Sequence, residues 1–122
     1  MKDDAVHEQT QNLVQELRRG VIVLAVLSQL DQEQYGYSLM KGLEDQGLQV
    51  DQGTLYPLLR RLEEQGLLAS DWRVETSRPR RYYILSEFGK EVLENMTSEW
   101  ERIKTTMDNM LTNTKEIQNE AD

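Results

Sequence analysis

Residues 51–68 have the sequence DQGTLYPLLRRLEEQGLL, which carries the signals of a capped amphipathic helix. Asp51 is a favourable N-cap, Gly66 is a favourable C-cap, and Pro57 lies near the first turn, where its missing N–H costs little. Between these caps, apolar side chains recur at the spacing of one helix face. The stretch therefore predicts a helix over residues 52–65 that buries Leu55, Leu58, Leu59 and Leu62 and leaves Gln52, Thr54, Tyr56 and Arg60 on its other sides.

Two more helices are predicted upstream of this stretch. A short helix over about residues 37–46 has apolar residues on one face and ends at Gly47. A longer helix over about residues 9–29 is apolar on nearly every side in its second half, which therefore belongs in the centre of the fold. Gly20 leaves two interpretations open: one continuous helix, or a break with residues 13–19 as a separate short helix.

Downstream, the pattern changes from helical to alternating. Residues 68–74 and 81–85 are rich in aromatic and β-branched residues, and residues 75–80 join them, which predicts a two-stranded hairpin that must lean on the helices. Residues 52–85 contain six arginines and four acidic residues, whereas the whole chain has a net charge of −8. A basic hairpin in an acidic chain is the charge asymmetry expected of a nucleic-acid footprint.

The last predicted helix begins at the N-cap Ser86 and runs to about Thr112. Its apolar residues are spaced 3, 4, 3, 4 and 3 apart, which is a seam for another helix, and Ile117 continues the phase. A helix of about 27 residues spans about 40 Å, more than the rest of a small domain can cover. We therefore expect the seam to pack against a second copy of the chain. The expected dimer interface consists of Leu13, Leu93, Met96, Trp100, Ile103, Met107 and Met110.

Composition excludes several classes of protein. The 122 residues include no Cys and one His, His7, which excludes disulfide frameworks and thiolate sites and argues against a histidine metal site or a Ser-His-Asp triad. The longest apolar run, Val21–Leu27, is too short to span a membrane, and the N-terminus lacks the layout of a signal peptide. We expect a soluble, cytoplasmic protein with no cofactor, metal or enzymatic activity, and polar ends, residues 1–11 and 112–122, that fray.

Three helices, a basic hairpin and a long helix, in this order, form the plan of a winged helix-turn-helix protein. The predicted fold class is therefore mainly α with a small β-hairpin, in one structural domain. Residues 1–85 form the N-terminal helix and the winged helix-turn-helix, and residues 86–122 form a long C-terminal dimerisation helix. In such motifs the third helix enters the major groove of DNA, and the wing reaches the backbone or the minor groove.

Three ordered motifs resemble the signature segments of the PadR family of transcriptional regulators. They are YGYSL at residues 35–39, GTLYPLLRRLEEQGLL at residues 53–68 and RRYYILSEFG at residues 80–89, and the resemblance covers about residues 17–103. It implies a homodimer that binds a palindromic operator in double-stranded DNA and releases it on meeting a small molecule. The single C-terminal helix is similar to the shorter subfamily, which includes multidrug-sensing repressors and has a Trp at the dimer interface, as Trp100 would be here.

The start of the third helix and the hairpin carry the expected DNA contacts. Thr and Tyr hydroxyls reach phosphates, Gln pairs with adenine, and Arg neutralises phosphates. The alternative is that Thr54 only caps the helix and Tyr56 only packs, and that Arg81 holds the hairpin by pairing with Glu75. The resemblance adds two backbone contacts at the start of the second helix. The full set is Tyr37, Ser38, Gln52, Thr54, Tyr56, Arg60, Arg78 and Arg80.

Two residues at the start of the second helix are expected to have structural roles. Gly36 is expected to allow a sharp turn into the second helix, and Tyr35 is expected to lie in the core.

Trp100 has two interpretations. It is an ordinary seam residue, or it is the flat wall of a site for a planar, apolar effector between subunits. The resemblance favours ligand binding, and Lys104 would suit an acidic aromatic ligand. The candidate effector residues are Leu17, Val21, Ala25, Met96, Trp100 and Lys104.

The sequence thus predicts a dimeric DNA-binding repressor released by a small aromatic or hydrophobic effector. The alternative is an acidic protein-interaction adaptor whose winged helix does not bind DNA, which the net charge of −8 favours. No carboxylate pair, base or nucleophile stands in an arrangement that indicates an enzyme.

Overall fold

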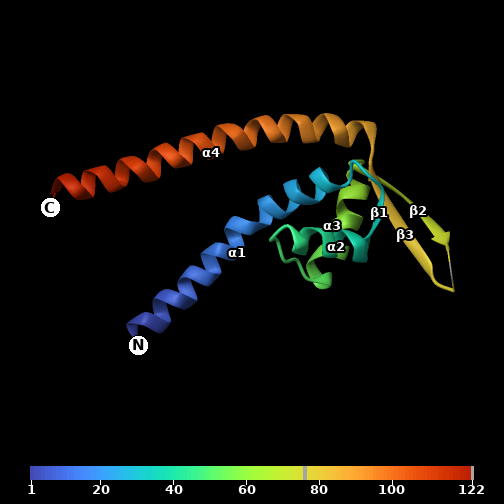
Figure 1. The fold of residues 1–122 in the computed structure, drawn as a ribbon, viewed down its shortest axis with the longest axis horizontal. Helices are drawn as coiled ribbons and strands as arrows, with labels where there is room; N and C mark the ends of the chain where they lie inside the picture. The colour runs from blue at the N-terminus through green and yellow to red at the C-terminus, as the bar shows by residue number, and fades with distance from the viewer. Residues whose placement is uncertain (76, 122) are drawn as a thin grey trace.

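The computed structural model describes residues 1–75 and 77–121, and the side chains of these residues up to Thr114. Four helices and three strands follow one another along the described chain (Figure 1), which confirms the mainly α fold with a small β-hairpin. The elements are α1 (Lys2–Gln29), β1 (Gln34–Tyr35), α2 (Gly36–Asp45), α3 (Gln52–Glu64), β2 (Leu68–Val74), β3 (Pro79–Leu85) and α4 (Glu87–Ala121).

The two long helices extend further than the sequence predicts. α1 begins at Lys2 and passes through Gly20 without a break, and α4 continues past Thr112 to Ala121. Residues 2–19 and 90–121 contain no Gly or Pro, so nothing local ends either helix in these stretches. The predicted seam residue Ile117 lies outside the residues whose side chains are described.

The sheet has one strand more than the predicted hairpin. Its strand order is β1-β3-β2, and all neighbours are antiparallel. β1 pairs Gln34 with Tyr83 and Tyr35 with Tyr82. A two-residue strand is too short to leave an alternating pattern, which is why the sequence does not indicate it.

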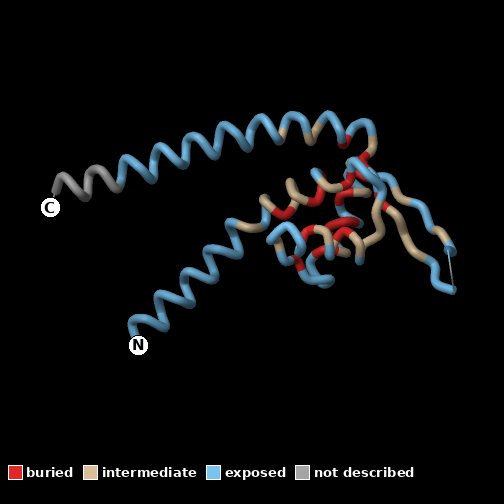
Figure 2. Tube along the Cα trace, in the orientation of Figure 1, coloured by how far each residue is buried: buried red, intermediate tan, exposed pale blue. Residues whose placement is uncertain are grey.

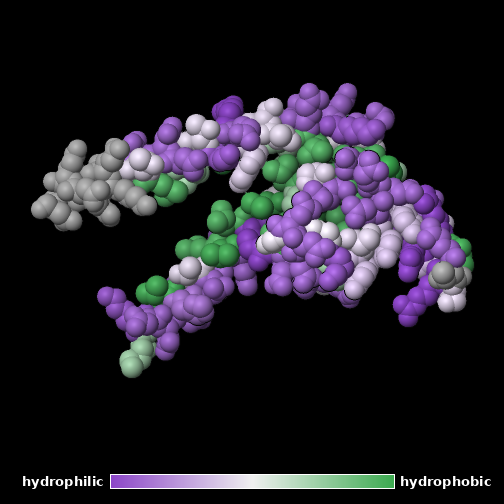
Figure 3. Space-filling view, in the orientation of Figure 1, coloured by the Kyte–Doolittle hydropathy of each residue, from purple (hydrophilic) through white to green (hydrophobic). Residues whose placement is uncertain are grey.

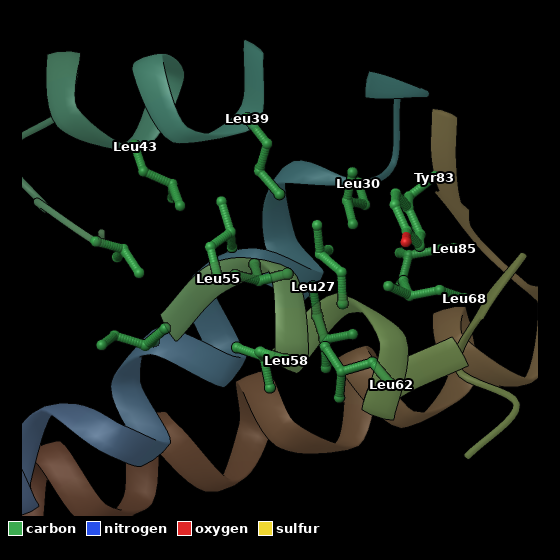
Figure 4. Packing of buried hydrophobic residues seen from close by; sticks show 14 residues of the cluster. Leu27, Leu30, Leu39, Leu43, Leu55, Leu58, Leu62, Leu68, Tyr83 and Leu85 are labelled. Atoms are coloured by element: carbon green, nitrogen blue, oxygen red, sulfur yellow. The ribbon is translucent and has the colours of Figure 1, made fainter. Parts of the chain in front are cut away.

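The core lies where the second half of α1, helices α2 and α3, and the base of the hairpin meet (Figures 2 and 4). It is built mainly of leucines, and burying each such side chain contributes about 1.5–3 kcal/mol relative to an exposed one. The predicted inner face of α3 is confirmed, because all four of its leucines are buried. The side chains that are almost fully buried are Val26, Leu27, Leu30, Leu39, Leu55, Leu59 and Leu62.

Two glycines end helices as predicted. Gly47 and Gly66 follow α2 and α3 with φ of 101° and 81°, the left-handed region that favours glycine. In each turn the next amide reaches back into the helix: Leu48 N donates to Leu43 O over 2.9 Å, and Leu67 N donates to Leu62 O over 3.0 Å. These bonds fix the direction in which the chain leaves each helix.

Ser86 caps α4 as predicted and also anchors it. Its Oγ accepts the amide N–H of Gly89 over 2.9 Å and donates to Gly66 O over 2.6 Å. The start of α4 approaches the turn so closely that a β-carbon at Gly89 would lie 2.1 Å from Leu67 O. The long helix is therefore joined rigidly to the turn that follows α3.

The first half of α1 and most of α4 project from this compact part and diverge (Figures 1 and 2). Their facing sides are apolar yet exposed, as the green surface in Figure 3 shows. Within the described residues, no helix is both long enough and apolar enough to cross a membrane. The exposed apolar residues on these two helices include Val6, Leu13, Val14, Leu17, Trp100, Ile103, Met107, Met110 and Leu111.

Candidate nucleic-acid interface

A groove of about 330 Å³ lies where the start of α2, helix α3 and the β2–β3 hairpin come together. It brings together four of the predicted contacts, Tyr37, Tyr56, Arg60 and Arg80, from three separate segments of the chain. Aromatic and arginine side chains dominate its walls, which suits a polyanion that also presents flat bases. The remaining lining residues are Tyr35, Gly36, Trp72, Pro79, Arg81 and Tyr83.

Tyr56 is half-buried and lies against Gly36. A β-carbon at Gly36 would lie 2.3 Å from Tyr56 Cε1, so the ring occupies the space that any other side chain at residue 36 would need. The chain does turn from β1 into α2 at Gly36, but the described glycines with positive φ are Gly47 and Gly66, so this turn does not use the left-handed conformation that favours glycine. The function of Gly36 is to admit the Tyr56 ring. Tyr56 thus packs, as the alternative interpretation held, while its ring still faces the groove.

The hydroxyls at the helix starts are already used inside the protein. Thr54 Oγ1 donates to Asp51 Oδ1 over 2.7 Å, and Ser38 Oγ donates to Tyr35 O over 2.9 Å. Either hydroxyl must turn away from this partner before it donates to a phosphate. By contrast, Gln52 and Tyr37 are exposed, and Tyr37 keeps half of its surface open.

Tyr35 is half-buried at the sheet edge, so its expected place in the core is wrong. Its ring lies edge-on to that of Tyr82, with 5.5 Å between centroids, and the Arg80 guanidinium lies 4.5 Å from the Tyr35 centroid. The aromatic ring therefore positions Arg80 beside the groove without neutralising it.

The four hairpin arginines fall into two classes. Arg73 donates to Glu33 and pairs with Asp71 over 3.2 Å, and the hydrogen bond to Glu33 raises its already high pKa. Arg81 is also paired, whereas Arg78 and Arg80 form no ion pair with any residue that the structure describes. The two unpaired arginines are those predicted to contact DNA.

Arg81 pairs with Glu63 of α3 over 2.5 Å, so the expected partner Glu75 is wrong. Glu75 instead accepts the hydroxyl of Tyr82 over 2.8 Å, and this hydrogen bond raises the pKa of Tyr82. Burial raises the pKa of Tyr83. Both tyrosines therefore stay neutral at physiological pH and add no negative charge to the face.

A second cavity, of about 280 Å³, lies between α1 and α4. Four of the predicted effector residues line it, namely Leu17, Val21, Met96 and Trp100, together with Gly20, Leu24, Glu99 and Ile103. Lys104 is not among the lining residues, and Ala25 packs against the core instead. The helical spacing of residues 17, 20, 21 and 24 is the signal that would have selected Leu24 rather than Ala25.

The predicted dimer interface residues fall into two groups, some packed against their own chain and the rest exposed. Leu93 and Met96 pack against the core of their own chain, so α4 uses the start of its seam to hold the compact part. The other five predicted interface residues are exposed: Leu13, Trp100, Ile103, Met107 and Met110.

The described residues contain no cluster of His, Cys, Asp and Glu able to hold a metal ion. His7, the one histidine of the chain, is exposed in the first turns of α1.

Comparison with known proteins places this fold and groove in a family. The model of the transcriptional regulator PadR-like family matches residues 23–95. The transcriptional regulator Rv3488 of Mycobacterium tuberculosis is 40% identical over 81 residues, which cover 66% of this chain and 76% of that protein. The matched segment includes α2, α3 and the hairpin, which together build the groove, and it continues into the start of α4.

Solved structures give the same result. The PadR family transcriptional regulator from Eggerthella lenta is 44% identical, with a TM-score of 0.82 over 88% of this chain and 96% of that one. A PadR family transcription regulator from Clostridium difficile is 33% identical, with a TM-score of 0.68 over 74% of this chain and 97% of that one. Together with the family match, these similarities establish that the chain belongs to the PadR family of DNA-binding transcriptional regulators.

Proposed function

We propose that the protein is a homodimeric repressor that binds a palindromic operator and releases it when a small aromatic or hydrophobic molecule enters the cavity between α1 and α4. The observation that carries the proposal is the separation of two surfaces. The groove with its unpaired arginines lies at one end of the compact part, and the exposed apolar helix faces lie at the other.

In this proposal α3 enters the major groove, with Gln52 and Tyr56 facing the bases. The DNA backbone follows the groove past Tyr37 and Arg60, and Arg78 and Arg80 neutralise phosphates from the wing, which is the β2–β3 hairpin. The support is that Arg78 and Arg80, unlike Arg73 and Arg81 of the same hairpin, carry charge not offset by an ion pair with any described residue. A local excess of arginine in an acidic chain concentrates DNA binding at this face.

The apolar faces of α1 and α4 support a dimer. Exposed apolar patches of this kind mark interfaces, and the commonest solution for identical chains is a two-fold axis. A two-fold pair also presents two α3 helices to successive major grooves about 34 Å apart. In this arrangement residues 86–122 dimerise and residues 1–85 provide the DNA-binding head, with Leu13 contributing from α1.

α1 gives a route from the cavity to the DNA. Leu17 and Val21 line the cavity, and between them Arg18 donates to the backbone oxygen of Gln49 in the α2–α3 turn. A ligand that shifts α1 therefore moves the turn that precedes the recognition helix. Such coupling is reciprocal, so operator DNA weakens effector binding by the same factor.

The test is a titration of the protein's own upstream DNA, with sedimentation of the free protein and of the complex. We expect a dimer in both states and a dissociation constant below about 1 μM at low salt, since specific sites bind in the nanomolar range or tighter. A folded dimer that shows no binding below this concentration refutes the DNA-binding proposal. A monomer that binds DNA refutes only the dimer.

A further inference from the structure

We propose that Glu63, at the end of α3, is a positioning residue for DNA binding. It holds the wing at a fixed angle to the recognition helix, so that Arg78 and Arg80 reach the backbone while α3 occupies the major groove. The inference rests on the proposed function, because it takes these two arginines as DNA contacts.

The carboxylate of Glu63 is bonded to both strands of the wing. Its Oε1 accepts from Arg81 Nη2 of β3 over 2.5 Å, and its Oε2 accepts from Ser70 Oγ of β2. Arg81 Nε also donates to Ser70 Oγ over 3.0 Å. Three side chains from α3, β2 and β3 thus form a closed ring of hydrogen bonds, which resists rotation of the wing in a way that a single contact would not.

The guanidinium of Arg81, which takes part in these hydrogen bonds, also lies near two aromatic side chains. Arg81 Cζ lies 5.7 Å from the centroid of Trp72 and 5.4 Å from that of Tyr83. The side chains of Glu63 and Arg81 are 27% and 32% exposed, so solvent screens this pair less than a fully exposed one. The charge of Arg81 is therefore used within the protein, and its contribution to DNA binding is indirect.

The outer wing needs such a tether. Only the base of the hairpin enters the core, through Leu68, Leu85 and Tyr83, and a two-stranded hairpin is marginal on its own. The ring of hydrogen bonds among Glu63, Ser70 and Arg81 holds the wing about halfway along its length, next to Arg80 in β3. When α3 enters the major groove, a wing already held at the correct angle presents its arginines to the DNA backbone at high effective concentration.

Electrostatics alone predicts the opposite result for the removal of Glu63. Loss of an acid near DNA reduces repulsion and should strengthen binding. Glu64 provides the matched control, because it is the next residue of α3, is exposed, and forms no ion pair within the described part of the chain. Positioning and repulsion therefore predict changes of opposite sign for Glu63→Ala, and only repulsion applies to Glu64→Ala.

The experiment is a double-mutant cycle on affinity for the protein's own upstream DNA, with folding checked by thermal unfolding. We expect Glu63→Ala to weaken binding about fivefold and Glu64→Ala to leave it unchanged or tighter. Arg78→Ala should cost about tenfold in the native and Glu64→Ala backgrounds, the scale of one lost charge-assisted contact, but under about threefold with Glu63→Ala. Without the Glu63 carboxylate the wing is no longer held at the correct angle, so Arg78 contributes less to the affinity for DNA.

The outcomes separate the two proposals. If Arg78→Ala has no effect in the native protein, the wing is not a DNA contact, and the positioning role fails with it. If Arg78→Ala costs the same in all three backgrounds, the wing contact stands and the positioning role alone is refuted. The cycle is repeated with Glu63→Gln, which keeps the side-chain volume and one acceptor oxygen, so that a loss of folding in Glu63→Ala does not remove the test.

Discussion

The ring of Tyr56 lies in the space that a side chain at Gly36 would occupy, with Cε1 placed 2.3 Å from where a β-carbon would be. This approach joins the start of α2 to the first turns of α3, and both residues line the groove of the candidate nucleic-acid interface. The direction of the Tyr56 ring is therefore set by the absence of a side chain at residue 36.

Gly36→Ala is expected to displace Tyr56, to lower the free energy of unfolding by about 1–3 kcal/mol, and to weaken DNA binding, because overpacking forces the ring out of place. Gly42→Ala is the matched control in the same helix, since a β-carbon there meets no described atom within 4 Å. It should raise the free energy of unfolding by about 0.5–1 kcal/mol through helix propensity. Urea unfolding and anisotropy titrations measure both effects, and equal behaviour of the two variants would contradict the packing argument.

Arg78→Ala is expected to reduce the salt dependence of DNA binding. Each lost phosphate contact lowers the slope of log K against log salt by about 0.9, hence by about 1.8 for a dimer with two wings. Arg102→Ala removes the same charge from an exposed site on α4 and should leave the slope unchanged. An unaltered slope and affinity after combined Arg78→Ala and Arg80→Ala would favour the protein-interaction adaptor instead.

Ile103→Glu is expected to dissociate the dimer. Ile103 is exposed on the apolar side of α4, and placing a carboxylate in an apolar interface costs more than the 1.4 kcal/mol that changes an equilibrium about tenfold. Thr105→Glu adds the same charge two residues away, on the opposite side of the helix, and should leave the dimer intact. Analytical ultracentrifugation over a range of concentrations decides between them. A dimer unaffected by Ile103→Glu would place the interface elsewhere.

Trp100→Ala is expected to weaken the binding of planar aromatic compounds to the cavity between α1 and α4 by about tenfold, through loss of the apolar area that a Trp provides. Anilinonaphthalene sulfonate is a suitable probe because its emission rises on apolar contact. Trp72→Ala is the control, since Trp72 lies on the wing and not in this cavity. Operator DNA should weaken probe binding to the native protein, and equal losses in the two variants would argue against a site at Trp100.

The elements set by local signals were predictable from the sequence. The leucine face of α3, the glycines after α2 and α3, and the cap at Ser86 depend on neighbouring residues, and all of them are confirmed. The ends of α1 and α4 were less predictable because no breaker residue marks them, so polar composition gave the wrong bounds.

The candidate site depends on contacts between residues that lie far apart in the sequence, and these contacts were harder to predict. Arg81 lies six residues from Glu75 but pairs with Glu63, which only the packing of α3 on the hairpin brings close. The function of Gly36 likewise depends on a ring twenty residues away in sequence. Spacing selects the face of a helix, but it does not reveal which partner the fold places against that face.

The close packing at Ser86 and Gly89 fixes the direction in which α4 leaves the compact part. The first turn of α4 lies so close to the turn after α3 that a β-carbon at Gly89 would lie 2.1 Å from Leu67 O, so we expect the compact part and the helix to turn together. A helix of 35 residues is roughly 50 Å long, so a tilt of about 5° at its root sweeps the far tip through roughly 4–5 Å. In the proposed dimer, a small shift where the two α4 helices cross would therefore change the angle between the two DNA-binding parts.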